Sequence, residues 1–167
     1  MEKAAIFIDA GYFTKVLKNY FWEPPIDYLK LSEQICKDLG LIRLRTYFYH
    51  CMPIIREVKE EGYLQQEEDQ RRYQEDKLQF EEDKNRYAAM QRFITKLRRL
   101  PRFEVKFGKL QIIGGEFNQK MIDVLMSIDI VEKCLGKQIQ HAILIAGDSD
   151  FIPAIKRAKD YGAIIHL

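Results

Sequence analysis

The sequence predicts an α/β fold built on a central, mostly parallel sheet. Short apolar runs rich in β-branched residues alternate with stretches that have the composition of helices. Such runs, bounded by Gly or polar residues, are typical of strands buried on both faces of a sheet. The expected strands are residues 4–8, 42–49, 103–110, 142–145 and 163–167. The helical stretches between them indicate βαβ units, in which successive strands pair in parallel.

Helices are expected over about residues 12–20, 27–39, 122–135 and 151–161. Asp27 is a suitable N-cap for the second helix, and Gly40 fits its C-terminal end. Gly162 fits the end of the last helix in the same way. Pro24 and Pro25 separate the first two helices, because proline breaks a helix that continues through it.

Composition bounds the class of protein. The chain has 167 residues, 47% of them apolar, which is enough for the core of one domain over residues 1–167. The formal net charge is +2, so any nucleic-acid partner would bind a local patch. Cys36, Cys51 and Cys134 are widely spaced, which argues against disulfides or a zinc knuckle and indicates a reducing, cytoplasmic location. The N-terminus lacks a signal-peptide pattern, and no apolar stretch approaches the roughly 18–20 residues that cross a membrane.

The middle of the chain departs from the alternation of strands and helices. Residues 56–100 are dense in Glu, Asp, Arg, Lys and Gln, so we expect a long charged helix or helical hairpin inserted in the domain. A stripe of larger apolar residues recurs there every seven residues: Tyr73, Phe80, Tyr87 and Ile94. The stripe fits an arm that binds a protein partner or forms a homodimer. It also fits a solvated helix with one face against the domain.

Two of the apolar runs end at aspartates. Asp9 follows residues 4–8 directly, and Asp148 and Asp150 follow residues 142–145 after Ala-Gly. In an open parallel sheet, ligands bind just beyond the carboxyl ends of the strands, so these carboxylates converge if the two strands are neighbours. Clustered carboxylates stay ionised only if a cation neutralises them. All-oxygen ligands favour Mg²⁺ or Mn²⁺, and such an ion can activate water and bind a phosphate, which indicates hydrolysis of a phosphodiester.

The helix expected over residues 122–135 can add a further carboxylate. Asp123 lies at its start and reaches the site if that end of the helix lies at the same edge. Asp129, six residues later, is about 240° further round the helix, so the two cannot share a face. Each aspartate also has a simpler interpretation as a helix cap or turn residue. Several caps gathered at the ligand-binding edge of one sheet make a metal site the more economical account.

Two segments at the expected acidic edge are Phe7–Phe13 (F-I-D-A-G-Y-F) and Ile145–Pro153 (I-A-G-D-S-D-F-I-P). Together they resemble the NYN-domain family, a branch of the PIN-like nucleases, and in particular its LabA-like bacterial group. The segment Gln119–Val124 resembles the family's central motif, in which Lys and Asp open a helix. The resemblance covers residues 4–167 apart from the charged insert near residues 56–86. It implies a three-layer αβα sandwich of the PIN-like, Rossmann-like kind and a divalent-metal ribonuclease that acts on RNA.

The resemblance also implies roles for individual residues. The catalytic and metal-binding carboxylates would be Asp9, Asp123, Asp148 and Asp150, with Asp129, a frequent acid of the family, as a further ligand. Two positions differ from the usual pattern. Tyr12 stands where many members have Asn, and Met121 stands where Gly usually follows the Lys. Neither difference removes a carboxylate, so metal binding should tolerate them better than turnover does.

Positive charge concentrates around Phe103 and Phe107, where it could follow phosphates while the aromatic rings stack on bases. The basic residues are Lys96, Arg98, Arg99, Arg102, Lys106, Lys109 and Lys120. The alternative is that these residues form the polar face of a helix and an edge strand. The residues expected to contact substrate are Lys120, Tyr12, Ser149, Arg99 and Arg102.

The predicted function is therefore a metal-dependent endoribonuclease. The alternative is a catalytically weak RNA- or protein-binding regulatory module. Such a module would retain the fold and the acids and use the helical arm for partner binding or dimerisation.

Overall fold

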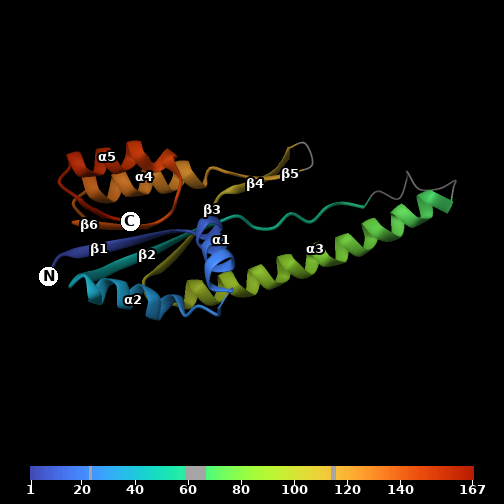
Figure 1. Cartoon of the computed structure of the whole chain (residues 1–167), viewed down its shortest axis with the longest axis horizontal. Helices are drawn as coiled ribbons and strands as arrows, with labels where there is room; N and C mark the ends of the chain where they lie inside the picture. Colours follow the sequence, from blue (N-terminus) through green and yellow to red (C-terminus); the bar gives the residue numbers. More distant parts are fainter. Residues whose placement is uncertain (23, 59–66, 114–115) are drawn as a thin grey trace. The chain divides into compact units, whose positions relative to one another are not determined.

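The computed structural model describes residues 1–22, 24–58, 67–113 and 116–167, with the backbone alone described for residues 67–69, 110–113 and 116–120. The strands are β1 (Lys3–Asp9), β2 (Ile42–His50), β3 (Phe103–Phe107), β4 (Lys109–Ile113), β5 (Glu116–Lys120), β6 (His141–Ile145) and β7 (Ile164–His166). The helices are α1 (Ala10–Phe21), α2 (Tyr28–Asp38), α3 (Glu67–Arg99), α4 (Ile122–Leu135) and α5 (Ile152–Asp160), with a short 3₁₀ turn, η2 (Ser149–Phe151), before α5 (Figure 1). Within these ranges, no helix combines the length and the apolar character that crossing a membrane requires.

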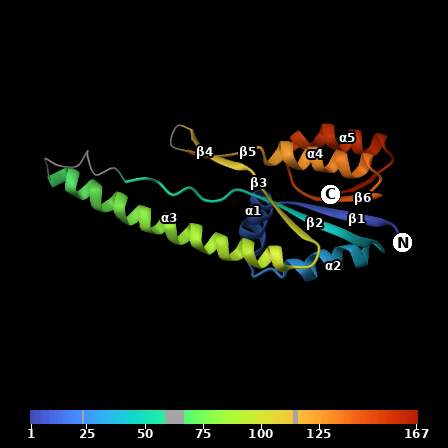
Figure 2. The same cartoon turned by 180° about the vertical axis from the view of Figure 1, so that it is seen from behind.

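The predicted α/β fold is confirmed. Strands β3, β2, β1, β6 and β7 form one sheet in that order, and every neighbouring pair is parallel. The strand order reverses between β1 and β6, which pair from Ala4 with His141 to Ile8 with Ile145. Helices α1 and α2 cover one face of the sheet, and α4 and α5 cover the other (Figure 1, and from behind in Figure 2). This arrangement is the three-layer sandwich that the resemblance implies.

A hydrophobic core lies between the sheet and the α4–α5 layer. Side chains alternate between the two faces of a strand, so Ala5 and Phe7 of β1 point to this layer. Phe7 stacks on Tyr47 of β2, with ring centroids 5.2 Å apart. From α4, buried Met126 and Ile130 pack into the same core at a spacing of one helical turn. This packing fixes α4 against the two central strands.

The opposite face of the sheet is covered by α1 and α2. Phe13 of α1, Tyr28 of α2 and Phe48 of β2 form a chain of edge-to-face aromatic contacts, with centroid separations of 6.0 and 5.3 Å. As predicted, Asp27 is the N-cap of α2, and its side chain accepts a hydrogen bond from the Lys30 N–H at 3.0 Å. The layer therefore begins at a cap that the sequence already indicates.

One expected strand ends earlier than predicted. Residues 103–110 are predicted as a single strand, but β3 stops at Phe107. The N–H of Gly108 donates to the carbonyl of His50 at 3.0 Å, and the chain then leaves the sheet. Strand β4 pairs instead with β5 in a separate antiparallel ladder. The turn expected at Gly114–Gly115 lies outside the described residues.

The chain divides into two compact units, one formed by Met1–Cys51 with Lys96–Leu167 and the other by Met52–Thr95. The first unit holds both sheets and the helices other than α3. The second holds residues 52–58, which are neither helix nor strand, and most of α3. The predicted long charged helix is therefore present, but it begins at Glu67 and not near residue 56.

Asp83 joins the two described parts of the second unit. Its carboxylate, almost fully buried, accepts hydrogen bonds from Arg56 Nε at 2.9 Å and Nη2 at 3.2 Å, and from Arg86 Nη2 at 3.1 Å. The bonds from Arg56 hold the pKa of Asp83 below its usual value. Phe80 and Tyr87, both half-buried, lie three residues before and four residues after Asp83. The seven-residue stripe therefore shares the helix face that binds the extended segment.

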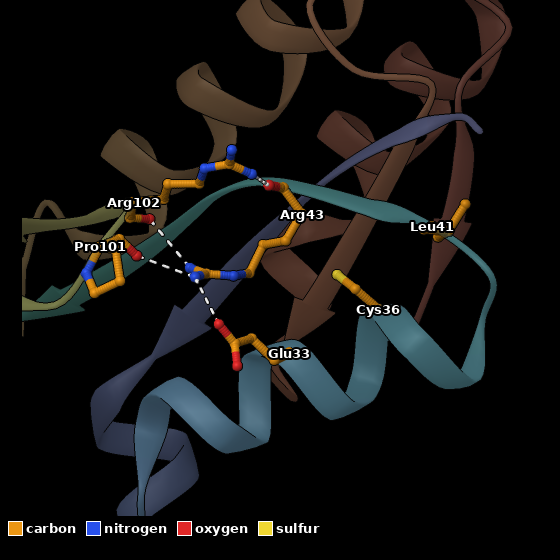
Figure 3. A pocket seen from close by; sticks show the side chains of 6 residues that line it. All are labelled: Glu33, Cys36, Leu41, Arg43, Pro101 and Arg102. Atoms are coloured by element: carbon orange, nitrogen blue, oxygen red, sulfur yellow. Dashed lines mark hydrogen bonds and ion pairs between the residues drawn. The ribbon is translucent and has the colours of Figure 1, made fainter.

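A buried arginine ties β2 to the turn before β3. The Arg43 guanidinium donates to the carbonyl oxygens of Pro101 at 3.0 Å and Arg102 at 3.4 Å, and to Thr46 Oγ1 at 3.3 Å. In return, Arg102 Nη1 donates to the Arg43 carbonyl at 2.7 Å. Figure 3 shows both arginines beside a pocket of about 300 Å³ that lies against α2. These bonds fix the start of β3 at the amino end of the sheet.

Replacing Arg43 by Met should lower the free energy of unfolding by about 2–4 kcal/mol, because the carbonyls of the turn lose their donors. Urea denaturation measures the loss. Arg45→Met is the matched control on the same strand, since Arg45 pairs with Glu104 at 2.6 Å where both side chains are solvent-accessible. That exposed pair should contribute less than about 1 kcal/mol. We call the hydrogen bonds between Arg43 and the turn at Pro101–Arg102 the Arg43 clamp. Equal losses for the two variants would contradict its contribution to stability.

Candidate metal centre

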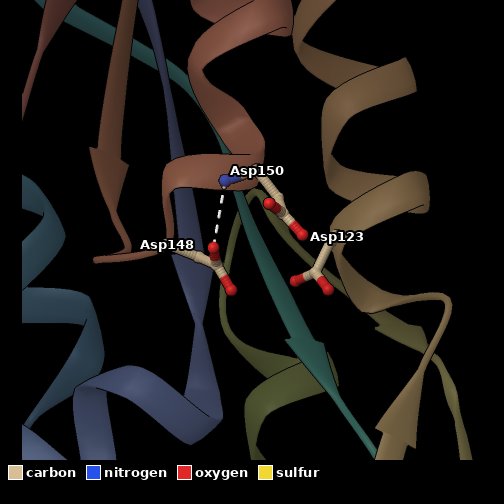
Figure 4. A group of neighbouring side chains, drawn as sticks. All are labelled: Asp123, Asp148 and Asp150. Carbon is tan, nitrogen blue, oxygen red and sulfur yellow. Dashed lines mark hydrogen bonds between the residues drawn. The ribbon is translucent and has the colours of Figure 1, made fainter.

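The carboxyl ends of β1 and β6 lie side by side where the strand order reverses. In doubly wound sheets, ligands bind in the crevice at this reversal. Figure 4 shows three aspartates converging there, Asp123 from α4 and Asp148 and Asp150 from the turn after β6. Each offers one carboxylate oxygen, and these oxygens all lie within 4.8 Å of one another. The structure thus brings together three of the four aspartates predicted as catalytic.

Asp148 is oriented by the turn that follows β6. It is the N-cap of η2, and its Oδ1 accepts a hydrogen bond from the Asp150 N–H at 3.0 Å. Both side chains are exposed to solvent. The cap uses one carboxylate oxygen, and a carboxylate can bind a metal through the other. Capping and metal binding, which the sequence leaves as alternatives for Asp148, are therefore compatible.

Asp123 lies in the first turn of α4 and is half-buried. Its pKa is raised above the usual value, chiefly by burial and further by the negative charges of Asp148, Asp9 and Asp150. Among the residues whose side chains the structure describes, each charged neighbour that shifts this pKa is acidic. The carboxylate therefore sits in a negative potential that a bound cation would relieve.

Asp9 stands beside the group of three. It is the N-cap of α1, and its Oδ1 accepts a hydrogen bond from the Tyr12 N–H at 3.1 Å. Its charge is among those that raise the pKa of Asp123, so its carboxylate interacts with the cluster electrostatically. The fourth predicted acid thus acts on the same edge of the sheet.

Tyr12 and Ser149, both predicted to contact substrate, also lie at this edge. The Tyr12 ring packs on the backbone of Gly147, because a Cβ atom there would lie 2.1 Å from Tyr12 Cε2. A larger residue before Asp148 would therefore displace the ring. Tyr12 is nevertheless 39% exposed, and Ser149 is exposed in η2. Both side chains are accessible next to the aspartates.

Asp129 lies apart from the group of three, in the interior of the domain. The residue is 5% exposed, and its carboxylate accepts hydrogen bonds from Tyr49 Oη at 2.6 Å and from Lys106 Nζ at 2.7 Å. Burial and the bond to Asp129 raise the pKa of Tyr49, so this hydroxyl remains a donor. The helical spacing had already separated Asp129 from Asp123. Its observed contacts anchor α4 to β2 and β3.

Of the predicted basic residues whose side chains the structure describes, Arg99 and Arg102 lie away from the aspartates. Arg102 lies at the start of β3 with its guanidinium in the Arg43 clamp, and Arg99 is the exposed last residue of α3, just before that turn. Both therefore lie at the amino end of the sheet, opposite the acidic cluster. Lys106 is bonded to Asp129. Lys120 ends β5, and its side chain lies outside the described part of the chain.

Sequence reasoning missed two contacts that shape this edge. The partners of Asp129, Tyr49 and Lys106, are 80 and 23 residues away in sequence, and no local pattern links them. The packing of Tyr12 on Gly147 also joins distant segments. The glycine directly before Asp148 was an available signal, because glycine marks a close approach to the backbone.

A doubly wound sheet with carboxylates at its switch point defines a class of α/β proteins suited to bind a cation there. The NYN domain model matches residues 3–167. The chain is also 32% identical over 59 residues to the uncharacterized protein y4oD of Sinorhizobium fredii, a match that covers 35% of this chain and 28% of that protein. The chain thus spans less than a third of that relative. No solved structure matches this chain significantly.

Because the match extends over nearly the whole chain, this protein belongs to the NYN-domain family, which is part of the PIN-like nucleases and consists typically of ribonucleases.

Asp123→Asn should stabilise the metal-free protein at neutral pH, raising the melting temperature by about 2 °C, because one of four repelling carboxylates is neutralised. The pKa of Asp123 is higher in the folded state than in the unfolded chain. Above the folded-state pKa, the ionised carboxylate therefore destabilises the fold; below the pKa of the unfolded chain, it is protonated in both states and has no such effect. The gain should therefore vanish below about pH 4, the ordinary pKa of aspartate. Thermal melts from pH 3 to pH 7 test this, with exposed Asp160→Asn as the control. A lower melting temperature for Asp123→Asn at neutral pH would refute it.

Asp129→Asn should destabilise the protein, in contrast to Asp123→Asn. It should lower the free energy of unfolding by about 1–3 kcal/mol, since two buried charge-assisted hydrogen bonds are weakened. Mn²⁺ binding measured by titration calorimetry should change little, because this carboxylate is not part of the group of three. Loss of Mn²⁺ binding with unchanged stability would instead make Asp129 a ligand.

Proposed function

We propose that this protein is a divalent-metal-dependent ribonuclease that hydrolyses RNA phosphodiesters at the edge formed by Asp9, Asp123, Asp148 and Asp150. One observation carries the proposal. Three carboxylates gather within 4.8 Å at the switch point of the sheet, in a chain that matches the NYN domain over residues 3–167. NYN nucleases act on RNA, which supplies the substrate class.

The residues present suit a Mg²⁺ or Mn²⁺ ion. The cluster offers carboxylate oxygens, which are the ligands that these hard cations prefer. The acidic neighbours that raise the pKa of Asp123 would be balanced by the ion's charge. When bound, such an ion supplies a Lewis acid for the phosphoryl oxygens and lowers the pKa of a coordinated water.

Backbone hydrogen bonds orient two of the proposed ligands before any substrate arrives. The N–H groups of Tyr12 and Asp150 each hold one oxygen, of Asp9 and of Asp148 respectively. This pre-organisation reduces the movement needed to bind an ion. We assign substrate contacts to Tyr12 and Ser149, which are accessible at this edge, and to Lys120, which precedes the start of α4. Arg99 and Arg102 are not part of the assignment, because they lie at the other end of the sheet.

Asp148→Asn should abolish cleavage while keeping the fold, because Asn is as good an N-cap as Asp and removes only the charge. The assay follows a labelled single-stranded RNA with Mn²⁺ or Mg²⁺. It compares wild type, wild type with EDTA, Asp148→Asn and the control Asp160→Asn. We expect a fall in rate of about 100-fold or more for Asp148→Asn, since several kcal/mol of transition-state stabilisation depend on the metal.

Cleavage that persists both in EDTA and in Asp148→Asn would refute the proposal. A wild-type chain that binds Mn²⁺ in calorimetry but leaves RNA intact would point to the second candidate, a regulatory module that binds RNA or protein. The control variant separates a general effect of losing an acid from the loss of this carboxylate.

A further inference from the structure

The C-terminal end of α1 carries exposed aromatic side chains. Tyr20, Phe21 and Trp22 are 75%, 58% and 96% exposed. Residues of this size ordinarily bury much of their apolar area. Trp22 is also the C-cap of α1, with a left-handed backbone (φ 58°) and its N–H bonded to the Leu17 carbonyl. That conformation costs a non-glycine residue roughly 1–2 kcal/mol, so the chain holds this indole in solvent at some expense of stability.

Helix α1 is also basic. Its sequence, Ala10–Phe21, contains no Asp or Glu, and Lys15 and Lys18 are both exposed. Lys106 and Arg102, in contrast, are bonded within the domain, Lys106 to Asp129 and Arg102 to the Arg43 carbonyl of β2. On α1, exposed rings and positive charge therefore coincide. This combination is typical of surfaces that bind single-stranded nucleic acid.

The same helix connects this surface to the acidic edge, by which we mean the edge of the sheet that carries Asp9, Asp123, Asp148 and Asp150. It begins directly after Asp9, and the Tyr12 ring packs on Gly147 beside Asp148. Lys15 follows Tyr12 by three residues and Lys18 follows Lys15 by three, so each side chain lies beside the one before it and the row turns gradually round the helix. At 1.5 Å of rise per residue, the distance along the helix from Tyr12 to Trp22 is about 15 Å. We call this row, together with the exposed Trp22 at the helix end, the α1 track: Tyr12, Lys15, Lys18 and Trp22.

We propose that the α1 track binds single-stranded RNA that extends from the acidic edge, with bases stacked on Tyr12 and Trp22 and phosphates bound by Lys15 and Lys18. This proposal rests on the proposed function, from which it takes RNA as the substrate class. The strand must be single because only unpaired bases present a face to an aromatic side chain. A nucleic acid fits better than an apolar protein segment, because two exposed lysines lie between the rings of Tyr12 and Trp22 and Tyr12 continues the track to the carboxylates.

Trp22 reports on this interaction directly, since it is the only tryptophan among the 167 residues. The full chain is titrated with unlabelled oligouridylate in EDTA, so that no cleavage occurs, and tryptophan emission is recorded. We expect saturable quenching by the single strand and much weaker quenching by an RNA duplex at equal nucleotide concentration. Vesicles of phosphatidylcholine with phosphatidylglycerol should leave the emission unchanged.

Variants measured by anisotropy of labelled oligouridylate test the individual side chains. Trp22→Ala and Tyr12→Ala should each weaken binding about 5- to 100-fold, whereas Trp22→Phe should retain most of the affinity because it still stacks. Tyr161→Ala, which removes a similarly exposed tyrosine at the end of α5, is the matched control. The double variant Lys15→Gln/Lys18→Gln should reduce the slope of log affinity against log salt by about 1.4, because each phosphate that a lysine neutralises adds about 0.7 to that slope.

RNA binding that neither changes Trp22 emission nor weakens in Trp22→Ala would overturn the α1 track. Emission that responds to the vesicles but not to RNA would do the same and identify a membrane surface. These outcomes are separate from failure of the proposed function. The titration contains no metal and requires no turnover, so a chain without nuclease activity can still show quenching. A chain that cleaves RNA without quenching would keep the nuclease and lose the track.

Discussion

The acidic edge depends on one interaction, the direct parallel pairing of β1 with β6. Their register runs from Ala4 with His141 to Ile8 with Ile145, so the two buried apolar runs end side by side. The polar residues that follow each run, Asp9 and Asp148, are placed at the same edge as a consequence. A slip of one residue would turn every side chain of a strand to the other face and destroy both core layers, so burial itself protects the register. Because α4 packs on the same strands, its first turn brings Asp123 to that edge.

The charged residues of the first unit fall into two groups, one paired within the fold and one left without a neutralising charge among the described contacts. Arg102 is bonded within the clamp and Lys106 to Asp129, so these cations stabilise the turn before β3 and the position of α4. The partners of the carboxylates at the acidic edge are uncharged, because Asp9 and Asp148 accept hydrogen bonds from backbone N–H groups. Such a bond orients a carboxylate without neutralising it. The fold thereby keeps a negative potential at one edge of the sheet, in the place where a divalent cation and a phosphate would meet.

Local pattern explains which parts of the structure the sequence predicts. Apolar runs ending at polar residues located β1 and β6 to within one residue of each end, and helical spacing separated Asp123 from Asp129. The position of Arg102 was available in the same way, because it directly precedes the strand predicted over residues 103–110 and the amino end of a parallel strand lies opposite the edge that binds ligands. Its bond to Arg43, 59 residues away, could not be predicted, because no local pattern links the two residues. The break at Gly108 was missed for a related reason. The pattern continues across it, while the bond to His50 that ends β3 comes from another strand.

Met121 shows how the backbone delivers Asp123. It is the N-cap of α4 and adopts a left-handed conformation (φ 74°), which glycine reaches without steric penalty and methionine reaches at about 1–2 kcal/mol. The conformation is held from both sides: Lys120 before it is paired with Lys109 in the β4–β5 ladder, and the Met121 carbonyl after it accepts the Leu125 N–H at 2.9 Å. The bend between ladder and helix is therefore fixed by main-chain hydrogen bonds, and the side chain at this position is secondary. A methionine in the place of the family's usual glycine can thus be accommodated at a small loss of stability while Asp123 still reaches Asp148 and Asp150.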